Sequence, residues 1–218
     1  MTTPRAVERT VFLADGFNLY HSLEKAVYLE PTKGVKWLDL NGLFSNVLGA
    51  ISGWQELTAV YYFTAYANYQ KEHFPDKLTR HRAYVRALTA SGVHVKVHDF
   101  KRKTHQRPET GERIRLWEEK ETDVAIACKL LELAARDELD TAVLVTGDTD
   151  LRPAVETFQS LYPKKRILFA FPFSRKNREL EVLAPDSFIL SRKSYAENQF
   201  PDKVRLPSNK YVHKPREW

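Results

Sequence analysis

The sequence predicts an α/β fold with a mostly parallel central sheet, and two observations lead to this prediction. Short apolar runs bounded by turn residues recur along the 218 residues, and segments with helical spacing of apolar residues separate them. Two of these runs, 10–14 and 142–145, end directly in acidic turns. Strands that alternate with helices form parallel sheets. The carboxyl ends of both runs are therefore expected at the edge where such sheets bind ligands.

In the first half of the chain, periodicity and turn residues define each element. The residues Leu19, Leu23 and Val27 recur at helical spacing, and Asp39 or Asn41 can cap the next helix. In order, the expected elements are a strand at 10–14, a helix at 18–28, a helix at 37–51, a strand at 57–64, a helix at 68–91 interrupted near Pro75, and a strand at 93–97.

In the second half, residues 120–136 form the clearest helical pattern. Val124, Cys128, Leu131 and Ala135 recur on one face, Thr122 can cap the start, and Cys128 is interpreted as a small buried residue. The other expected elements are a hairpin return arm at 114–117, a strand at 141–145, a helix at 151–161, a strand at 165–171, a helix at 177–183 and a strand at 187–190.

The predicted domain covers residues 1–190 and carries a basic insert at about 94–117. Residues 191–218 have no periodic pattern, so we expect an extended or disordered basic C-terminal tail.

Composition limits the function classes. A hydrophobic content of 43% is enough for a globular core, while no apolar run reaches the length of a membrane span, and we expect no signal peptide. The single cysteine excludes intramolecular disulfides and cysteine-cluster zinc sites, so a cytoplasmic protein is expected. The net charge of +6 favours a polyanionic partner such as nucleic acid. The oligomeric state stays open, with a homodimer as one alternative.

Four carboxylates are the candidate catalytic and metal-ligating groups: Asp15, Asp123, Asp148 and Asp150. Each alone is also explained as an ordinary turn or helix-cap residue. Together at one sheet edge they would repel each other unless a hard divalent cation, Mg²⁺ or Mn²⁺, neutralised them. Such an ion can activate water for attack on a phosphodiester. Asn18, one helical turn after Asp15, can position a water or a phosphate.

Three motifs, VFLADGFNL at 11–19, KETDVAIA at 120–127 and VLVTGDTDL at 143–151, resemble those of the NYN-domain proteins. These proteins form the branch of the PIN-like nuclease superfamily that includes the LabA-like (DUF88) proteins. The resemblance implies a PIN-like three-layer α/β/α sandwich and a metal-dependent ribonuclease site built from the four acids, with Asn18 beside them. Thr146 replaces the usual serine of the family and can contact a phosphate or hold the loop. Lys129 stands where many relatives have an acid.

The candidate RNA-binding residues are mostly basic and cluster in the insert. They are Lys101, Arg102, Lys103, Arg113, Arg115, Lys120, Lys129 and Thr146. A solvated basic loop is the alternative interpretation of the insert. The aromatic residues at 61–66 are interpreted as core strand residues and not as base-stacking platforms. Because the insert has no cysteine, no zinc is expected there.

The leading hypothesis is therefore a ribonuclease, an endonuclease-type enzyme that cleaves RNA with Mg²⁺ or Mn²⁺. The main alternative is an RNA-binding or protein-binding regulator whose nuclease activity is weak or lost, because Lys129 replaces an acid. A phosphatase or nucleotide hydrolase that uses the same acids is a third interpretation. The sequence contains no nucleophile elbow and no Walker glycine loop to favour a broader hydrolase or NTPase.

Overall fold

A seven-stranded sheet organises the computed structural model, which describes residues 7–31, 34–70, 74–106, 113–119 and 121–218. In spatial order β4-β3-β2-β1-β5-β6-β7, the strands are β4 (Arg113–Glu119), β3 (His94–Gln106), β2 (Gln55–Tyr66), β1 (Glu8–Asp15), β5 (Thr141–Val145), β6 (Arg166–Phe171) and β7 (Phe188–Ile189). All neighbours pair in parallel except β3 and β4, which form an antiparallel ribbon. The predicted mostly parallel sheet is confirmed.

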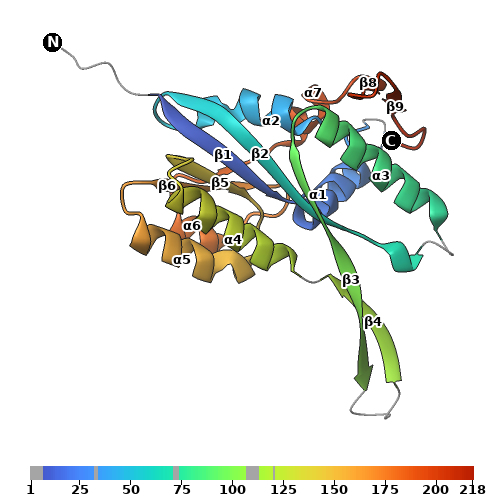
Figure 1. Cartoon of the computed structure of the whole chain (residues 1–218), viewed down its shortest axis with the longest axis horizontal. Helices are drawn as coiled ribbons and strands as arrows, with labels where there is room; N and C mark the ends of the chain where they lie inside the picture. Colours follow the sequence, from blue (N-terminus) through green and yellow to red (C-terminus); the bar gives the residue numbers. More distant parts are fainter. Residues whose placement is uncertain (1–6, 32–33, 71–73, 107–112, 120) are drawn as a thin grey trace.

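Helices cover both faces of this sheet (Figure 1). One layer contains α1 (Gly16–Leu29), α2 (Leu40–Val47), α3 (Pro75–Ala90) and α7 (Arg192–Glu197). The other layer contains α4 (Thr122–Ala135), α5 (Arg152–Leu161) and α6 (Arg178–Leu183). Short 3₁₀ turns lie at 48–50, 68–70 and 149–151. The α/β/α sandwich predicted from the sequence is therefore observed.

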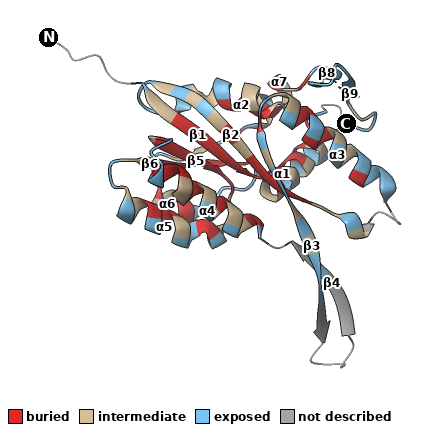
Figure 2. Ribbon diagram, viewed as in Figure 1, coloured by how far each residue is buried: buried red, intermediate tan, exposed pale blue. Residues whose placement is uncertain are grey.

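Successive residues of β1 face opposite cores, which explains why its sequence is a continuous apolar run. Phe12 and Ala14 belong to the core under α1, α2 and α3, whereas Val11 and Leu13 belong to the core under α4 and α5. The buried residues concentrate on the central strands (Figure 2). Asp15, the polar residue that ends β1, is therefore itself buried, at 4% exposed.

The helix beginning at 122 corrects two predictions. Its N-cap is Glu121, so Thr122 lies inside the first turn and does not act as the cap. Its buried face carries Ile126, Leu130 and Leu133. Cys128 is exposed, so the prediction that it is a small buried residue was wrong. The sequence offers two apolar stripes on this helix, and only packing against β1 and β2 selects between them.

The helices near Asp39 and Pro75 are shorter than expected. Asp39 is the cap of α2, because its side chain accepts a hydrogen bond from the Asn41 backbone N–H. Proline is tolerated in the first turn of a helix, and α3 begins at Pro75 itself. In the part of the predicted helix before Pro75 that the structure describes, residues 68–70 form a 3₁₀ turn.

The predicted extended or disordered tail is wrong, because residues 191–218 fold onto the sandwich. They form α7 and an antiparallel pair, β8 (Lys203–Arg205) and β9 (Tyr211–His213). Tyr195 and Phe200 join the core, and the Trp218 ring lies 5.9 Å from the ring of Tyr84. Single aromatic anchors at irregular spacing bury this segment, which is why no period was visible in its sequence. Within the described ranges, no helix is long and apolar enough to cross a membrane.

We predict that Tyr195→Phe lowers the free energy of unfolding by about 1–3 kcal/mol, the typical cost of leaving buried polar groups unpaired. The Tyr195 hydroxyl is bonded to the Ser22 hydroxyl at 3.0 Å and accepts from the Phe173 N–H at 3.0 Å. Denaturant unfolding measures the change. The matched control is Tyr211→Phe at a side chain that is 53% exposed. Equal stability of the two variants would contradict the integration of this segment into the core.

Candidate acidic site

The acids gather where the sheet changes direction. The chain builds β1, β2 and β3 outward to one side and β5, β6 and β7 to the other, so β1 and β5 are neighbours at the switch. Asp15 is the last residue of β1, and Asp148 follows the end of β5. The carboxyl ends of strands at such a switch point form a crevice that binds ligands in open α/β sheets.

Asp15 is held by three hydrogen bonds. Its Oδ1 accepts from the backbone N–H groups of Phe17 and Asn18, both at 3.0 Å, and thereby caps α1. Its Oδ2 accepts from the Thr146 hydroxyl at 3.0 Å. Burial raises the pKa of Asp15, although the hydrogen bonds from Asn18 and Thr146 oppose this, and the charge of Asp148 raises the pKa further. The hydrogen bonds therefore fix the carboxylate in position, although burial and the charge of Asp148 disfavour its ionised form.

The loop after β5 is tied to α1 by side-chain hydrogen bonds. The Gly147 N–H donates to Oδ1 of Asn18 at 3.1 Å, and the Asp148 N–H donates to the Thr146 hydroxyl oxygen at 3.1 Å. Asp148 in turn accepts from the Asp150 N–H at 3.1 Å. Thr146 is 1% exposed, so the geometry favours loop-holding over phosphate contact for this residue. Asn18 also acts here as a connector between the two strand ends.

Two positions in the acidic turns require glycine because the backbone of another segment lies very close to them. The sequence indicated these two glycines only as turn residues. A Cβ on Gly147 would lie 2.0 Å from the carbonyl oxygen of Arg175, and one on Gly16 would lie 2.5 Å from that of Phe63. No side chain fits at such distances. The glycines therefore let the two acidic turns pack against neighbouring backbone.

Asp123 reaches the same place from the first turn of α4. Single carboxylate oxygens of Asp15, Asp123 and Asp148 all lie within 4.8 Å of one another. The pKa of Asp123 is raised to about 6, first by burial and then by the charges of Asp15, Asp148 and Asp150. Asp150 is exposed and lies outside this group of three acids, but its charge helps to raise the pKa of Asp123.

This acid group fits a divalent cation. Two oxygens on one Mg²⁺ are at most about 4.2 Å apart, from metal–oxygen distances of about 2.1 Å. Neighbouring (cis) oxygens on such an ion are about 3.0 Å apart, so the three carboxylates, whose oxygens lie within 4.8 Å of one another, would draw closer together around it. Carboxylate oxygens are also the ligands that Mg²⁺ and Mn²⁺ prefer. The three acids can therefore hold a metal ion.

The predicted RNA-binding residues lie on several elements, and the structure describes only some of their side chains. Lys101 forms an ion pair with Glu121, two residues before Asp123, and Arg102 and Lys103 are exposed on β3. Only the backbone is described for Arg113 and Arg115 on β4, and Lys120 lies outside the described residues. Lys129 forms an ion pair with Glu132 and lies 5.5 Å from the ring centre of Tyr61. Their contact with RNA stays a prediction.

Comparisons with known proteins identify relatives of the whole sandwich. A family model described as NYN domain matches residues 9–192. The chain is 27% identical over 199 residues to 6-hydroxy-3-succinoylpyridine 3-monooxygenase HspA of Pseudomonas putida, covering 78% of this chain and 61% of that protein. It thus spans less than two thirds of that relative. A crystal structure of a protein of unknown function from Vibrio parahaemolyticus superimposes with a TM-score of 0.52 at 22% identity, covering 87% of this chain and 95% of that one, and shows the shared fold.

We predict that Gly147→Ala destabilises the protein by about 1–3 kcal/mol, the usual range for overpacking, and displaces the loop that carries Asp148. The added methyl would meet the Arg175 carbonyl, whereas Gly49→Ala, the control, enters open space. Chemical denaturation measures both variants. A Gly147→Ala protein as stable as the control would refute the close-packing role.

We also predict that Asp123→Asn stabilises the ion-free protein at pH 7.5 by about 1 kcal/mol, or about 2–4 °C in Tm. We expect a smaller free-energy change than the pKa shift alone implies, because solvent screens the charges around a half-buried group. A carboxyl pKa raised to about 6 means that folding is opposed above that pH and is relieved by protonation below it. The difference between variant and wild type should therefore shrink as the pH falls below about 6 and vanish only below the ordinary carboxyl pKa of 3.8. Thermal unfolding in EDTA across this pH range tests the sign, and a destabilised variant at pH 7.5 would contradict it.

Proposed function

The chain belongs to the NYN family of the PIN-like superfamily, and from this premise we propose that it is a metal-dependent ribonuclease. The family membership by itself points to a nuclease-like hydrolase. The proposal adds the substrate, RNA, and the cofactor, Mg²⁺ or Mn²⁺. The 61% coverage of the monooxygenase relative leaves that protein's activity outside the proposal.

One observation carries the proposal: three acids from separate parts of the chain share one small volume. Asp15 comes from the end of β1, Asp123 from the start of α4 and Asp148 from the loop after β5, with oxygens within 4.8 Å. Ordinary cap or turn roles explain each acid singly but not their convergence. Like charges at this spacing oppose folding, so a role that uses them is the simpler explanation.

The residues have distinct roles in the proposed reaction. Asp15, Asp123 and Asp148 would hold the ion directly, and exposed Asp150 would add negative charge or a water-mediated contact. A bound Mg²⁺ or Mn²⁺ supplies an activated water and neutralises charge on the phosphoryl oxygens. Asn18 and Thr146 keep the two strand ends in register through their hydrogen bonds. Water attack on the phosphodiester would leave a free 5′-phosphate on the product.

The proposed substrate follows from charge near the acids. The chain has a net charge of +6. The basic stretch Lys101, Arg102 and Lys103 lies on β3, and Lys101 forms an ion pair with Glu121, which is close in sequence to Asp123. The β3–β4 ribbon extends away from the sandwich (Figure 1). A strand of RNA that crosses the acids could lay its backbone along this ribbon.

A second candidate function is an RNA-binding regulator with little catalysis. The observation that favours it is Lys129, which is engaged with Glu132 where many relatives have an acid. The metal would then have fewer carboxylates than in those relatives. Calorimetric titration with Mn²⁺ separates the two candidates, because a regulator that does not cleave need not take up the ion.

We predict that Asp148→Asn lowers kcat/KM for cleavage of single-stranded RNA with Mn²⁺ by at least about 100-fold, the upper end of what outer-shell changes cost at metal sites. The control is Asp202→Asn at an exposed side chain. Cleavage is followed by gel electrophoresis, and the product ends are tested for 5′-phosphate. Unchanged activity of Asp148→Asn would remove the proposed site.

A further inference from the structure

A cavity of about 180 Å³ lies between α1, α3 and β2, next to the acidic site. Gly16 and Phe17, the two residues that follow Asp15, form part of its wall. Because α1 starts there, the cavity and the acids are reached from the same end of one helix. The wall combines residues of both helices, from Gly16 to Leu23 of α1 and from Lys77 to Tyr84 of α3.

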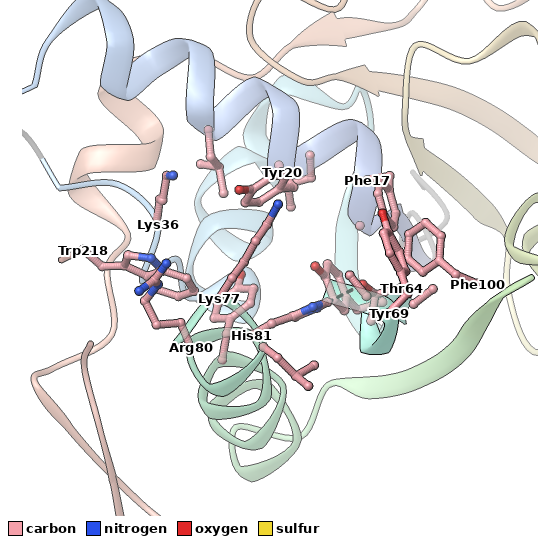
Figure 3. A pocket seen from close by; sticks show the side chains of 18 residues that line it. Phe17, Tyr20, Lys36, Thr64, Tyr69, Lys77, Arg80, His81, Phe100 and Trp218 are labelled. Carbon is pink, nitrogen blue, oxygen red and sulfur yellow. Dashed lines mark hydrogen bonds between the residues drawn. The ribbon is translucent and has the colours of Figure 1, made fainter. Parts of the chain in front are cut away.

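The two ends of the cavity differ in chemistry (Figure 3). Phe17, Tyr69 and Phe100 gather at one end, where the Phe17 and Phe100 rings meet at 5.5 Å and the Tyr69 and Phe100 rings at 5.2 Å. Lys36 and Arg80 lie at the other end, beside Trp218. Aromatic faces hold planar rings, and ammonium and guanidinium groups hold phosphate.

Cations at the second end are available for an anionic ligand. Lys36 lies 3.4 Å from Glu24 and Arg80 lies 3.8 Å from Glu217, and both pairs are partly exposed. Single ion pairs that solvent reaches contribute little stability. Lys77 has no carboxylate partner among the described residues, and its ammonium lies 5.9 Å from the ring centre of Tyr20. Of the three cations, Lys77 therefore keeps a positive charge that no carboxylate of the described residues pairs with, whereas Lys36 and Arg80 each have one carboxylate partner.

The middle of the cavity is polar but uncharged at neutral pH. Burial lowers the pKa of His81 to about 4, and its Nε2 is 3.1 Å from the Thr64 hydroxyl. A neutral imidazole can donate or accept a hydrogen bond, which suits the edge of a heteroaromatic ring. The interior is thus matched to a neutral, planar and polar-edged group.

We propose that this cavity receives one unpaired base of the RNA strand that is cleaved at the acidic site, and this rests on the ribonuclease function proposed above. The base would stack at the aromatic end, with one flanking phosphate at the acids and the other at Lys36, Lys77 and Arg80. Pockets for drug-sized ligands are about 300–1,000 Å³, so the cavity suits a single ring system. A base enters only when it is unpaired and unstacked, so the substrate class is single-stranded RNA.

The test measures binding separately from cleavage. A fluorescein-labelled single-stranded RNA hexanucleotide of mixed sequence is titrated in EDTA with Asp148→Asn protein, followed by anisotropy. A strand of the same length with abasic ribonucleotides is the matched probe, and duplex RNA and benzoate are competitors. The hexanucleotide should bind about tenfold more tightly than the abasic strand, since only the hexanucleotide offers a base that can stack on the aromatic rings.

Two variants change the aromatic end in opposite ways. Ala67→Trp, at a wall residue, fills the cavity, and Phe100→Ala removes a stacking face. Each should weaken the hexanucleotide about tenfold and leave the abasic strand unchanged. Lys77→Ala should weaken both strands several-fold, whereas Arg86→Ala, outside the wall on the same helix, should weaken neither. As a control, each variant is also made in the protein that retains Asp148, and its Tm is measured with and without Mn²⁺. A rise in Tm as large as that of the wild type shows that the variant keeps its acidic site.

Three outcomes would overturn the proposal. These are equal affinity for the hexanucleotide and the abasic strand, insensitivity to both Ala67→Trp and Phe100→Ala, and a cavity that takes benzoate but not the base. Base-dependent binding that the two variants abolish supports the cavity assignment even when wild-type protein does not cleave RNA with Mn²⁺. In that case the proposed ribonuclease function is wrong while the proposed base-binding cavity stands, so the experiment distinguishes failure of one proposal from failure of the other.

Discussion

The hydrogen bond from Thr146 to Asp15 joins the two strand ends on which the candidate site depends. It links the end of β1 to the loop after β5, and the Gly147–Asn18 hydrogen bond makes a second link between them. Both strands are central and buried, so their ends are fixed by the sheet. The remaining freedom lies in the turns, and these two bonds remove it. The carboxylates can thus stay close together despite their mutual repulsion.

That repulsion has a physical consequence for the whole domain. Burial first, and then the charge of Asp148, raise the pKa of both Asp15 and Asp123, and this opposes folding at neutral pH. The sandwich tolerates the cost because large cores lie on both faces of the sheet. A bound cation would reverse the sign of the interaction, since ligand binding to the native state stabilises it. Stability and the proposed activity therefore meet at the same residues.

The C-terminal segment contributes to the neighbourhood of the site as well as to the core. Trp218 lines the aromatic cavity, and Tyr195 bonds to Ser22 of α1. The helix that starts at the acids is consequently supported along its length by chain from the other end of the sequence. Because Asp15 caps α1 and Gly16 and Phe17 of α1 line the cavity, this support holds one acid and one wall of the cavity on the same helix, and sites built on such rigid elements are more precise than sites on loops.

Much of this protein was determined by its sequence alone. Continuous apolar runs, the turns DGFN and TGDTD and the three motifs predicted the α/β/α sandwich and placed Asp15 and Asp148 at strand ends. These features are local, so they can be recognised from periodicity and turn chemistry. Only the tertiary structure decided which stripe of α4 is buried, that residues 191–218 fold, that Gly147 must pack against Arg175, and that a cavity adjoins the acids. Each of these depends on contacts between segments far apart in the chain, and no local pattern records such contacts.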